Sequence, residues 1–459
     1  MSAQNSLQIA GEFQIETCKI LTTSGMEFTI NNVVQSITIF ENIFSESISG
    51  VITIADTTDL VNNGPIIGEE KLLLKLVTPQ ANKTQETTID FTKTPLSLYK
   101  IGTQMGEGEK AAIVTLHFTS QEAFFNSTSL ISKSYTGKCS EILKKIFRDD
   151  RYLRSTKKLN VEETVGTKKI VFPNMKPFQA IKLLTRQSKS KNFNSSPSYL
   201  FYETTKGFNY RTVDGMCSQQ SKLSYAETTP DAIDDRSGQK DVVNNLTSIS
   251  KYTVNTPRDI IGNSFHGMYG SKHTIHDLYN KSVSTRRYNY HKEFDKDTHL
   301  NSQPLASQSV DAITTKSISD YQDTINFVTT TSSGRGFEEN GNYSFGSDSL
   351  GQIISRRQSR LRQLQNGISL NIEVPGNTFL QAGDTINITI GASSSVTDRK
   401  NDPNLSGKFL ITKIRHDFVE DKETKHTMLM TVIKDSTINQ YPNASVSYEN
   451  KSKPEEIVL

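Results

Sequence analysis

The sequence contains no tryptophan, three cysteines and no long apolar run. Without tryptophan, the chain offers a poor basis for a cleft that stacks sugars. Cys18, Cys139 and Cys217 lie far apart without a CxxC pattern, so we expect reduced cytosolic thiols and neither a disulfide framework nor a zinc site. Because no stretch of about 18 apolar residues occurs, we expect no membrane span. The N-terminus has no basic region followed by a long apolar core, so we expect no secretory signal.

Charge of one sign is not in excess either. The chain has 52 Lys and Arg residues against 49 Asp and Glu residues, and this balance does not predict a nucleic-acid-binding protein. Apolar residues make up 34% of the 459 positions, which is low for a large globular chain. Short antiparallel strands with one wet face fit this composition, as do surfaces that partner subunits complete. A chain of this length should hold about three or four domains.

The two ends of the chain carry similar strand patterns. Apolar residues alternate at Leu72, Leu74 and Leu76, at Val114, Leu116 and Phe118, at Ile386, Ile388 and Ile390, and at Met428, Met430 and Val432. Alternation with a period of two predicts half-buried strands, because successive side chains leave a strand on opposite faces. The spacing from Leu72 to Leu116 equals the spacing from Ile386 to Met430. The pattern indicates one β-module used twice.

Further positions extend this repeat. Both copies carry a Lys-Ile pair, Lys100-Ile101 and Lys413-Ile414, and an acidic residue precedes each first strand, at Glu70 and Asp384. Upstream, Thr53–Asp56 resembles Thr274–Asp277, which predicts that the second copy is interrupted by a long insertion in a loop. The alternative is that two unrelated antiparallel β-domains share alternating strands.

In the middle of the chain, the spacing of apolar residues changes from that of a strand to that of a helix. Ser140 can cap a helix with Ile142, Leu143, Ile146 and Phe147 on one face, and Pro177 can open a second helix. Tyr199–Tyr202 and Phe208–Tyr210 flank a turn and predict a hairpin. A further helix is expected from Leu350 to about Gln365, and it ends at Asn366-Gly367.

These patterns predict a mostly β chain with an α+β middle domain and two similar antiparallel β-barrel tube modules, the second interrupted by an insertion. The expected parts are a first tube-like barrel at 1–120, an α+β domain at 121–243, a second tube-like barrel from 244–280 and 366–437, an insertion at 281–365 with a long polar loop and a C-terminal helix, and an extended tail at 438–459.

Candidate sites for chemistry are weak. In a strand, His273 and His276 would point to opposite faces, which argues against a shared metal ion. The polar loop at 398–404 has no EF-hand glycine or closing Glu, so we expect a turn rather than a calcium site. We expect Asp149 and Asp150 to form surface ion pairs, and His416-Asp417 to be solvated. Because no G-x-S-x-G, Walker-type or HExxH motif occurs, we predict no enzyme and assign no catalytic, cofactor-binding or metal-binding residue.

Two basic groups have alternative interpretations. The arginines of the predicted 350–365 helix could form a solvated face, or they could bind acidic groups on a neighbouring subunit. We choose Arg356, Arg357 and Arg360 as candidate interface residues between neighbouring modules. The basic and aromatic residues from Arg286 to Lys292 could contact nucleic acid, but one short cluster is a small footprint.

The closing part of the chain resembles a known family. It has Gly383-Asp384 before a strand, the turn Asp402–Gly407 with the pattern Asp-x-x-Leu-Ser-Gly, a Lys-Ile strand and a final hairpin. This pattern is similar to the last domain of the baseplate hub proteins of contractile-tailed, T-even-like phages. Ser132–Lys138, before the helix at Ile142, resembles the second domain of that family. The N-terminal hub part of type VI secretion spike proteins is related.

The resemblance implies a structural homotrimer. In that family each subunit gives two barrel domains to a ring, so three chains supply six similar modules. The ring then joins a six-fold tail tube to a three-fold central spike and leaves a channel for DNA. Implied partners are the tail tube protein, a central spike protein with or without a lysozyme domain, and other baseplate proteins. DNA would contact the chain only in transit. The implied location is the tail baseplate of the virion, after assembly in the host cytoplasm.

Two other classes stay open from the sequence. A β-rich phage or bacterial adhesin that binds glycans would also combine β-modules with polar loops. A wall-degrading enzyme is disfavoured because no acid/base pair can be placed.

Overall fold

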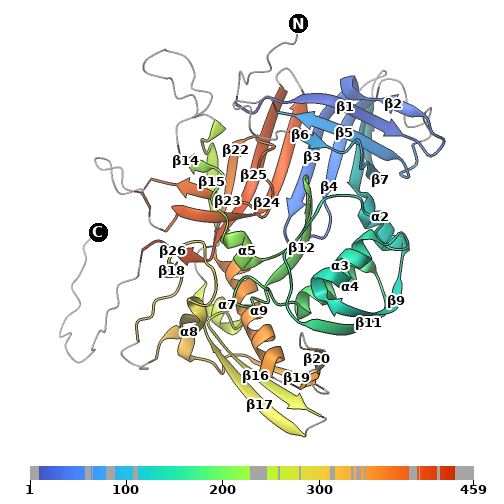
Figure 1. The fold of residues 1–459 in the computed structure, drawn as a ribbon. Coiled ribbons are helices and arrows are strands. Elements are labelled where there is room, and N and C mark those ends of the chain that lie inside the picture. The colour runs from blue at the N-terminus through green and yellow to red at the C-terminus, as the bar shows by residue number, and fades with distance from the viewer. Residues whose placement is uncertain are drawn as a thin grey trace.

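The computed structural model covers the whole chain. It describes residues 10–56, 64, 66–78, 88–106, 112–227, 246–256, 259–278, 281–310, 316–331, 335–337, 343–345, 348–391, 401–402, 404–420 and 424–439. Figure 1 shows a large sheet at one end, a helical region beside it and a smaller sheet that projects from the other end.

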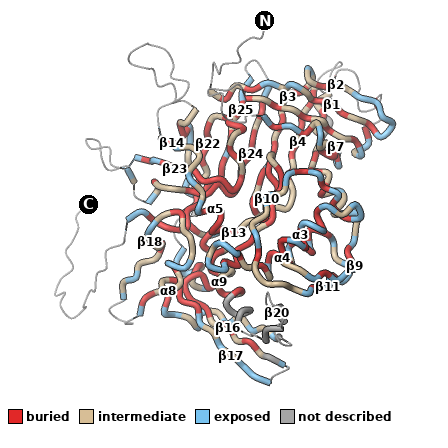
Figure 2. The backbone as a smooth tube through the Cα atoms, in the orientation of Figure 1, coloured by how far each residue is buried: buried red, intermediate tan, exposed pale blue. Residues whose placement is uncertain are grey.

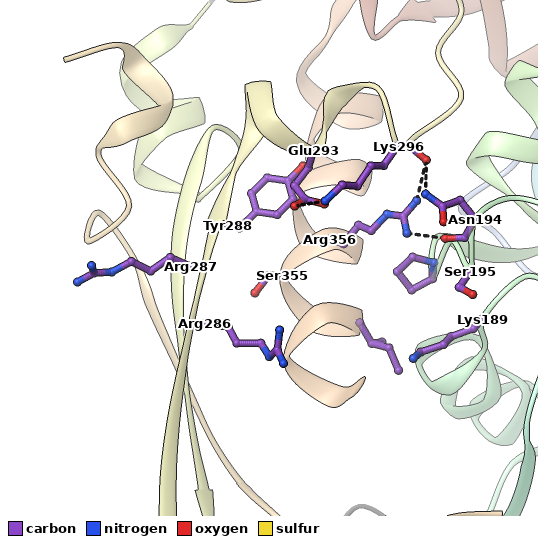
Figure 3. A pocket seen from close by; sticks show the side chains of 12 residues that line it. Lys189, Asn194, Ser195, Arg286, Arg287, Tyr288, Glu293, Lys296, Ser355 and Arg356 are labelled. Atoms are coloured by element: carbon purple, nitrogen blue, oxygen red, sulfur yellow. Dashed lines mark hydrogen bonds and ion pairs between the residues drawn. The ribbon is translucent and has the colours of Figure 1, made fainter. Parts of the chain in front are cut away.

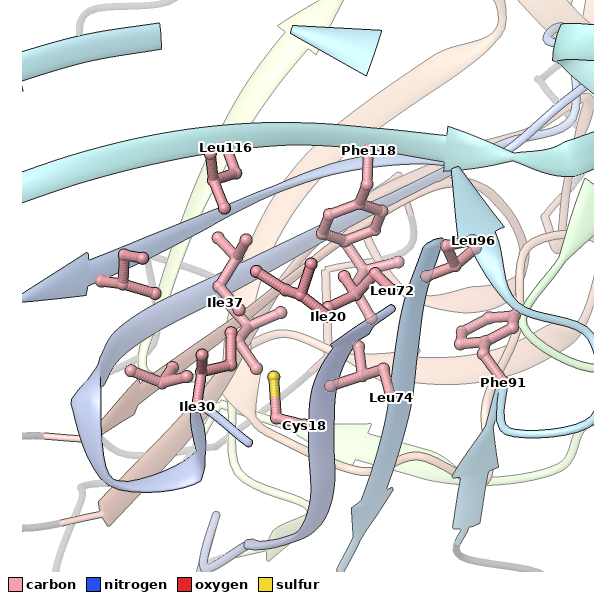
Figure 4. Close-up of a cluster of buried hydrophobic side chains, with 14 of the residues drawn as sticks. Cys18, Ile20, Ile30, Ile37, Leu72, Leu74, Phe91, Leu96, Leu116 and Phe118 are labelled. Atoms are coloured by element: carbon pink, nitrogen blue, oxygen red, sulfur yellow. The ribbon is translucent and has the colours of Figure 1, made fainter. Parts of the chain in front are cut away.

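The first module is a set of antiparallel strands from the N-terminal part of the chain. Its elements are β1 (Gln14–Leu21), β2 (Glu27–Thr29), the 3-10 helix η1 (Asn31–Val33), β3 (Val34–Asn42), β4 (Ser49–Asp56), β5 (Lys71–Val77), β6 (Thr88–Asp90), β7 (Leu96–Gly106) and β8 (Ala112–Ser120). The predicted alternation is confirmed, because Leu72, Leu74 and Leu76 are buried between partly exposed neighbours. They meet Cys18, Ile20 and Phe118 in one apolar core (Figure 4).

The second module uses strands from the C-terminal half. Its elements are β14 (Ser224–Ala226), β15 (Lys251–Thr256), β22 (Ile368–Pro375), β23 (Thr385–Thr389), β24 (Gly407–Glu420) and β25 (Thr424–Lys434). Ile386 and Ile388 are buried with Met428 and Met430, so the predicted inward faces are confirmed here too.

The two modules share a strand topology. In the sheet, the first module runs β5-β7-β8-β4-β3 and the second runs β23-β24-β25-β22-β15. Each neighbouring pair is antiparallel, and the strands occur in the same order along the chain. The matching strands are therefore β3 and β15, β4 and β22, β5 and β23, β7 and β24, and β8 and β25. The repeat seen in the sequence is a repeat of structure.

Individual contacts repeat as well. Ile101 lies opposite Leu116 in the first module, and Ile414 lies opposite Met430 in the second. A register shift precedes each Lys-Ile pair. The backbone N–H of Leu98 donates to the carbonyl of Glu70 over 2.9 Å. In the second copy, the N–H of Ile411 donates to the carbonyl of Asp384 over the same distance.

One predicted part of the repeat is wrong. Thr274–Asp277 lies in β16 (Gly270–Asp277), which pairs with β17 (Ser282–Asn289) and β19 (Asn326–Thr331) in a separate sheet. The strand that corresponds to β4, which contains Thr53–Asp56, is β22. Alternation alone could not tell these strands apart, because any half-buried strand has a period of two.

Both modules belong to one 14-stranded sheet with the path β15-β22-β25-β24-β3-β4-β8-β7-β5-β1-β2. The prediction of a mostly β chain with large antiparallel pairing is confirmed. Closure of either module into a barrel stays a prediction, as does the division of the chain at 120, 243, 280 and 365.

The middle region packs helices on two small sheets. Its elements are α2 (Gln121–Thr128), β9 (Ile131–Lys138), α3 (Cys139–Arg148), β10 (Leu159–Val161), β11 (Thr167–Met175), α4 (Pro177–Gln187), β12 (Tyr199–Thr204), β13 (Gly207–Thr212) and α5 (Val213–Cys217). Both helices and the hairpin are confirmed. The predicted Ser140 cap is wrong: Lys138 precedes the first turn, and the Ser140 hydroxyl bonds Thr164.

The remaining elements lie mainly between β15 and β22. They are α7 (Ile260–Phe265), β16, β17, α8 (Tyr290–Phe294), β18 (Gln303–Pro304), η2 (Ile318–Asp320), β19, β20 (Arg335–Phe337), β21 (Tyr343–Phe345) and α9 (Asp348–Asn366), and β26 (Ser436–Thr437) pairs with β18. The predicted C-terminal helix is α9. Figure 2 shows the projecting sheet as the more exposed end of the described chain. Within the described ranges, no helix is long and apolar enough to cross a membrane.

Candidate functional site

The two modules are joined strand to strand. Lys413–Val419 of β24 pairs antiparallel with Ser36–Asn42 of β3, and we call this pairing the β3–β24 joint. Thr38 donates its hydroxyl to Asp417 over 2.8 Å across the joint. Phe418 enters the core of the first module, where its ring lies 5.1 Å from that of Phe13.

The chain also buries apolar residues beside this joint. The N–H of Ile43, just after β3, donates to the carbonyl of Thr412 over 3.0 Å. The Ile43 side chain is fully buried in a cluster with Leu410 and Ala382 of the second module. The β3–β24 joint therefore combines backbone hydrogen bonding with burial of apolar side chains.

Glu41 connects a third part of the chain, the middle hairpin, to the β3–β24 joint through hydrogen bonds. Its carboxylate accepts from the backbone N–H of Ala382 over 2.7 Å and of Thr205 over 2.6 Å, and Thr205 lies in the turn of the middle hairpin. Burial raises the pKa of Glu41 to about 7, although these N–H groups act in the opposite direction. No local sequence pattern marks Glu41, because its partners are 164 and 341 positions away.

β15 corresponds to β3, and β7 corresponds to β24. In the described part of the chain, β15 and β7 each have an edge without a strand partner. The first half of β24 pairs with β23 and its second half with β3. β7 pairs with β5 only at Leu96 and Ser97, and no described strand takes that edge beyond them. β15 pairs with β22 on one side and ends the path of the sheet. Unpaired edges of this kind are templates for pairing with another chain.

Exposed apolar residues accompany both edges. Following β15, Ile260, Ile261 and Phe265 are 53%, 84% and 70% exposed, and we call them the α7 patch. Beside the start of β7, Ile67 and Tyr99 are 65% and 53% exposed, and we call them the β7 patch. A Cβ added at Gly68 would lie 3.5 Å from the carbonyl carbon of Tyr99, so the backbone next to Ile67 approaches that of Tyr99. Large contiguous apolar patches mark interaction sites, whereas single exposed apolar residues are common on protein surfaces.

The predicted interface arginines lie on α9, and all three bind groups of the same chain. Arg360 is 1% exposed and forms an ion pair with Asp435, and its Nε lies 3.8 Å from Asp214. Burial alone would lower the pKa of Arg360, but the two carboxylates raise it. Arg360 thus joins the end of the second module to α5.

Arg357 and Arg356 contact the middle region. Arg357 donates to the carbonyls of Thr185, Pro197 and Tyr199 over 2.8–3.2 Å, and burial lowers its pKa to about 10. Arg356 binds Asp297 over 2.7 Å. These contacts bring the three arginines to a junction within one chain, and contact with a neighbouring subunit stays a prediction.

A basic pocket lies next to this junction (Figure 3). Its volume is about 390 Å³, and its lining includes Lys189, Arg286, Arg287, Lys296 and Arg356 with one carboxylate, Glu293. The aromatic members of the predicted basic cluster, Tyr288 and Tyr290, are 6% and 0% exposed. They therefore have no free ring face for stacking on nucleic-acid bases.

The prediction that His416 is solvated is wrong. His416 and His426 are both fully buried in the sheet, and their Nδ1 and Nε2 atoms lie 3.2 Å apart. The ring of Phe418 stacks on His426 with centroids 3.9 Å apart. Burial lowers the pKa of His416 to about 3 and also lowers that of His426. The pair is part of the core.

The described ranges contain no group of three or more His, Cys, Asp or Glu side chains able to hold a metal ion. His273 is buried and His276 is partly exposed, in agreement with the predicted opposite faces. Asp398 of the considered calcium loop lies outside the described residues.

The fold recurs in solved structures. A tail protein from Neisseria meningitidis MC58 aligns with a TM-score of 0.52 and 11% identity, over 91% of this chain and 96% of that chain. The 43 kDa tail protein of prophage MuSo2 from Shewanella oneidensis aligns with a TM-score of 0.52 and 8% identity, over 92% and 99%. An E. coli type VI secretion component aligns with a TM-score of 0.42 and 8% identity, over 94% and 80%. No protein-family model and no curated protein matches the sequence.

These alignments confirm the resemblance to phage tail proteins over nearly the whole chain. At such low identity, the likeness defines a shared fold.

Proposed function

We propose that this chain is a structural baseplate hub subunit of a phage contractile tail, without a catalytic step of its own. Three copies form a pseudo-six-fold ring that joins a hexameric tail tube to a trimeric central spike. The ring leaves a channel through which DNA passes. Its partners are the tube protein, the spike protein and other baseplate proteins, and it resides in the virion.

The observation that carries this proposal is the repeated strand topology. Two equivalent modules in one chain let three chains present six similar units on one side of a ring. The insertion occurs in one module of each pair, so the other side keeps three-fold symmetry. The shared fold with two phage tail proteins supports the same assignment.

Particle mass and shape test this proposal. The purified chain should form rings whose mass is three times 51.3 kDa, seen by native mass spectrometry and by negative-stain electron microscopy. The image should show six similar densities around a hole. A 51.3 kDa monomer at every concentration, with no ring-shaped particles, would contradict the proposal.

A glycan-binding adhesin is the alternative function, and a panel of cell-surface glycans tests it. We expect no saturable binding to any of them. Saturable binding by the monomer would favour the adhesin.

A further inference from the structure

We propose that the basic pocket between α9, β17 and the loop after α4 binds a small phosphate-type anion with at least two negative charges. Inorganic pyrophosphate and the diphosphate group of a nucleotide have this chemistry. The site lies outside the repeated strands, so it goes beyond the proposed function and can be tested without ring assembly.

Three segments that are distant in the sequence surround the pocket. Figure 3 shows Arg286 of β17 and Lys189 of the loop after α4 pointing toward each other across α9, which contributes Ser355. The volume of about 390 Å³ lies within the range of small-molecule sites. Ile353 and Pro197 are buried apolar parts of the lining. An anion held there is partly shielded from water, which strengthens its attraction to cations.

Some cations of the pocket are already engaged. Arg356 forms an ion pair with Asp297, and Lys296 forms one with Glu293. Arg287 points away from α9 in Figure 3. These three cations therefore do not define the position of an added anion.

Lys189 and Arg286 are the other two cations of the lining. No described carboxylate forms an ion pair with Lys189, and the charged groups that act on it are Lys168 and Arg356. Burial and repulsion from these two cations lower the pKa of Lys189. An anion beside Lys189 replaces this repulsion with attraction. The planar guanidinium of Arg286 can donate to two oxygens of the same ligand.

Ser355 gives the pocket a further hydrogen-bond donor. It is 5% exposed, and its hydroxyl has no hydrogen-bond partner among the described residues. A buried hydroxyl is costly to leave without a partner, so such a group usually meets protein, water or a ligand. The donors of Ser355, Lys189 and Arg286 come from three segments. They suit a tetrahedral anion, with oxygens in several directions, better than a planar carboxylate.

The wall formed by Asn194 and Ser195 is held in a strained conformation. Both residues line the pocket and have positive φ angles, of 41° and 53°. Arg356 donates to the carbonyl of Asn194 over 2.7 Å, and the Asn194 amide donates to the carbonyl of Lys296 over 3.1 Å (Figure 3). Strained backbone of this kind clusters at ligand sites, where the surrounding contacts maintain it. These contacts keep the wall in place without a ligand.

Isothermal titration calorimetry with the full chain tests the site. Inorganic pyrophosphate should bind once per chain at constant ionic strength, and it should raise the melting temperature. Lys189→Ala and Ser355→Ala should each weaken this binding about tenfold or more, since each removes a hydrogen bond to a charged ligand. Lys144→Ala removes an exposed cation of α3 outside the pocket, so this control should bind like the wild type.

Ser355→Ala separates ligand binding from a structural role. Because the hydroxyl has no partner among the described residues, its removal should leave the melting temperature of the ligand-free protein unchanged. Weaker pyrophosphate binding at an unchanged melting temperature therefore supports the site. A Ser355→Ala protein that binds pyrophosphate like the wild type would overturn the proposal.

ADP identifies the source of the phosphate. It carries the same diphosphate group as pyrophosphate, so its binding should depend on Lys189 and Ser355 in the same way. Tighter binding of ADP assigns a nucleotide, and tighter binding of pyrophosphate assigns the free anion. If neither ligand binds, or if Lys144→Ala weakens binding as much as Lys189→Ala, the proposal is wrong. Binding to a short single-stranded DNA but to neither small ligand would also overturn it.

Discussion

Arg360 of α9 forms an ion pair with Asp435, and both side chains are 1% exposed. His299 also binds Asp435, over 2.9 Å, and the carbonyl of Thr298 accepts from Arg360. Burial would raise the pKa of Asp435, but Arg360 and His299 hold it well below its usual range. The Asp435 carboxylate thus binds residues that are 75 and 136 positions away in the sequence.

Replacing Arg360 by Met should destabilise the chain by about 3–5 kcal/mol, because it leaves the Asp435 carboxylate buried without its main cation. Calorimetry would show this loss as a lower melting temperature. Arg362→Met, on a partly exposed face of the same helix, is the control and should change the melting temperature little. Equal melting temperatures for the two variants would contradict the role given to Arg360.

Ile388→Asp should prevent folding of the second module. Ile388 is 1% exposed in an apolar cluster, so a carboxylate there would be buried without a partner and cost several kcal/mol. Thr389→Asp, at the next and exposed position, is the matched control. Limited proteolysis and soluble yield measure the difference, and a soluble, protease-resistant Ile388→Asp protein would show that the inward face is misassigned.

Glu41 should make stability fall as the pH rises from 4.5 to 7. Its pKa is about 7 in the folded chain, so the fold holds a proton that the unfolded chain releases above 4.5. The stabilisation is therefore complete below pH 4.5 and is lost as the pH passes 7, a change of about 3 kcal/mol.

Urea unfolding at a series of pH values measures this dependence. Glu41→Gln keeps a neutral side chain and should remove this one contribution, so its slope should differ from that of the wild type by about 1.4 kcal/mol per pH unit between pH 4.5 and 7. Glu27→Gln, with a side chain 53% exposed, should keep the wild-type slope. An unchanged slope in Glu41→Gln would refute the assignment.

The buried histidine pair should make stability fall as the pH falls, which is opposite to the effect of Glu41. His416 and His426 stay neutral in the fold, and the pKa of His416 is lowered to about 3. Their contribution to stability is complete above pH 6.5 and is lost as the pH falls toward 3, because the unfolded chain takes up the protons.

Acid titration of the unfolding free energy tests this expectation. The double variant His416→Leu with His426→Leu should take up about two fewer protons on unfolding between pH 6.5 and 4. His266→Leu, at an exposed position, serves as the comparison and should behave like the wild type. Identical proton uptake in all three proteins would show that the buried pair does not control acid stability.

Local pattern was enough to predict much of the fold. Alternation around Leu72 and Ile388 predicted strands and their inward faces, because that signal is contained within a few residues. The pairing between the two modules could not be predicted from local pattern, since β3 and β24 lie more than 360 positions apart in the sequence. The error at Thr274–Asp277 has the same origin: a period of two identifies a strand but not its sheet.

The candidate site was predicted less completely. The sequence identifies the arginines of α9 by type but not their partners. For Arg360, Asp435 is 75 positions away and Asp214 belongs to α5. The position of His416 before a predicted hairpin tip indicates a solvated side chain, whereas the β24–β25 pairing places it opposite Met428 in the core. Exposed apolar residues such as Ile261 could not be distinguished from core residues before burial was known.

The large insertion occupies a hairpin connection. In the first copy β3 passes to β4 through a short turn, and in the second copy β15 passes to β22 through residues 257–367, although both pairs are adjacent and antiparallel. Because the added polypeptide enters and leaves at neighbouring strands, it can lengthen, shorten or be exchanged without displacing any strand of the 14-stranded sheet. The length and composition of this connection are thereby uncoupled from the strand pairing of the two modules.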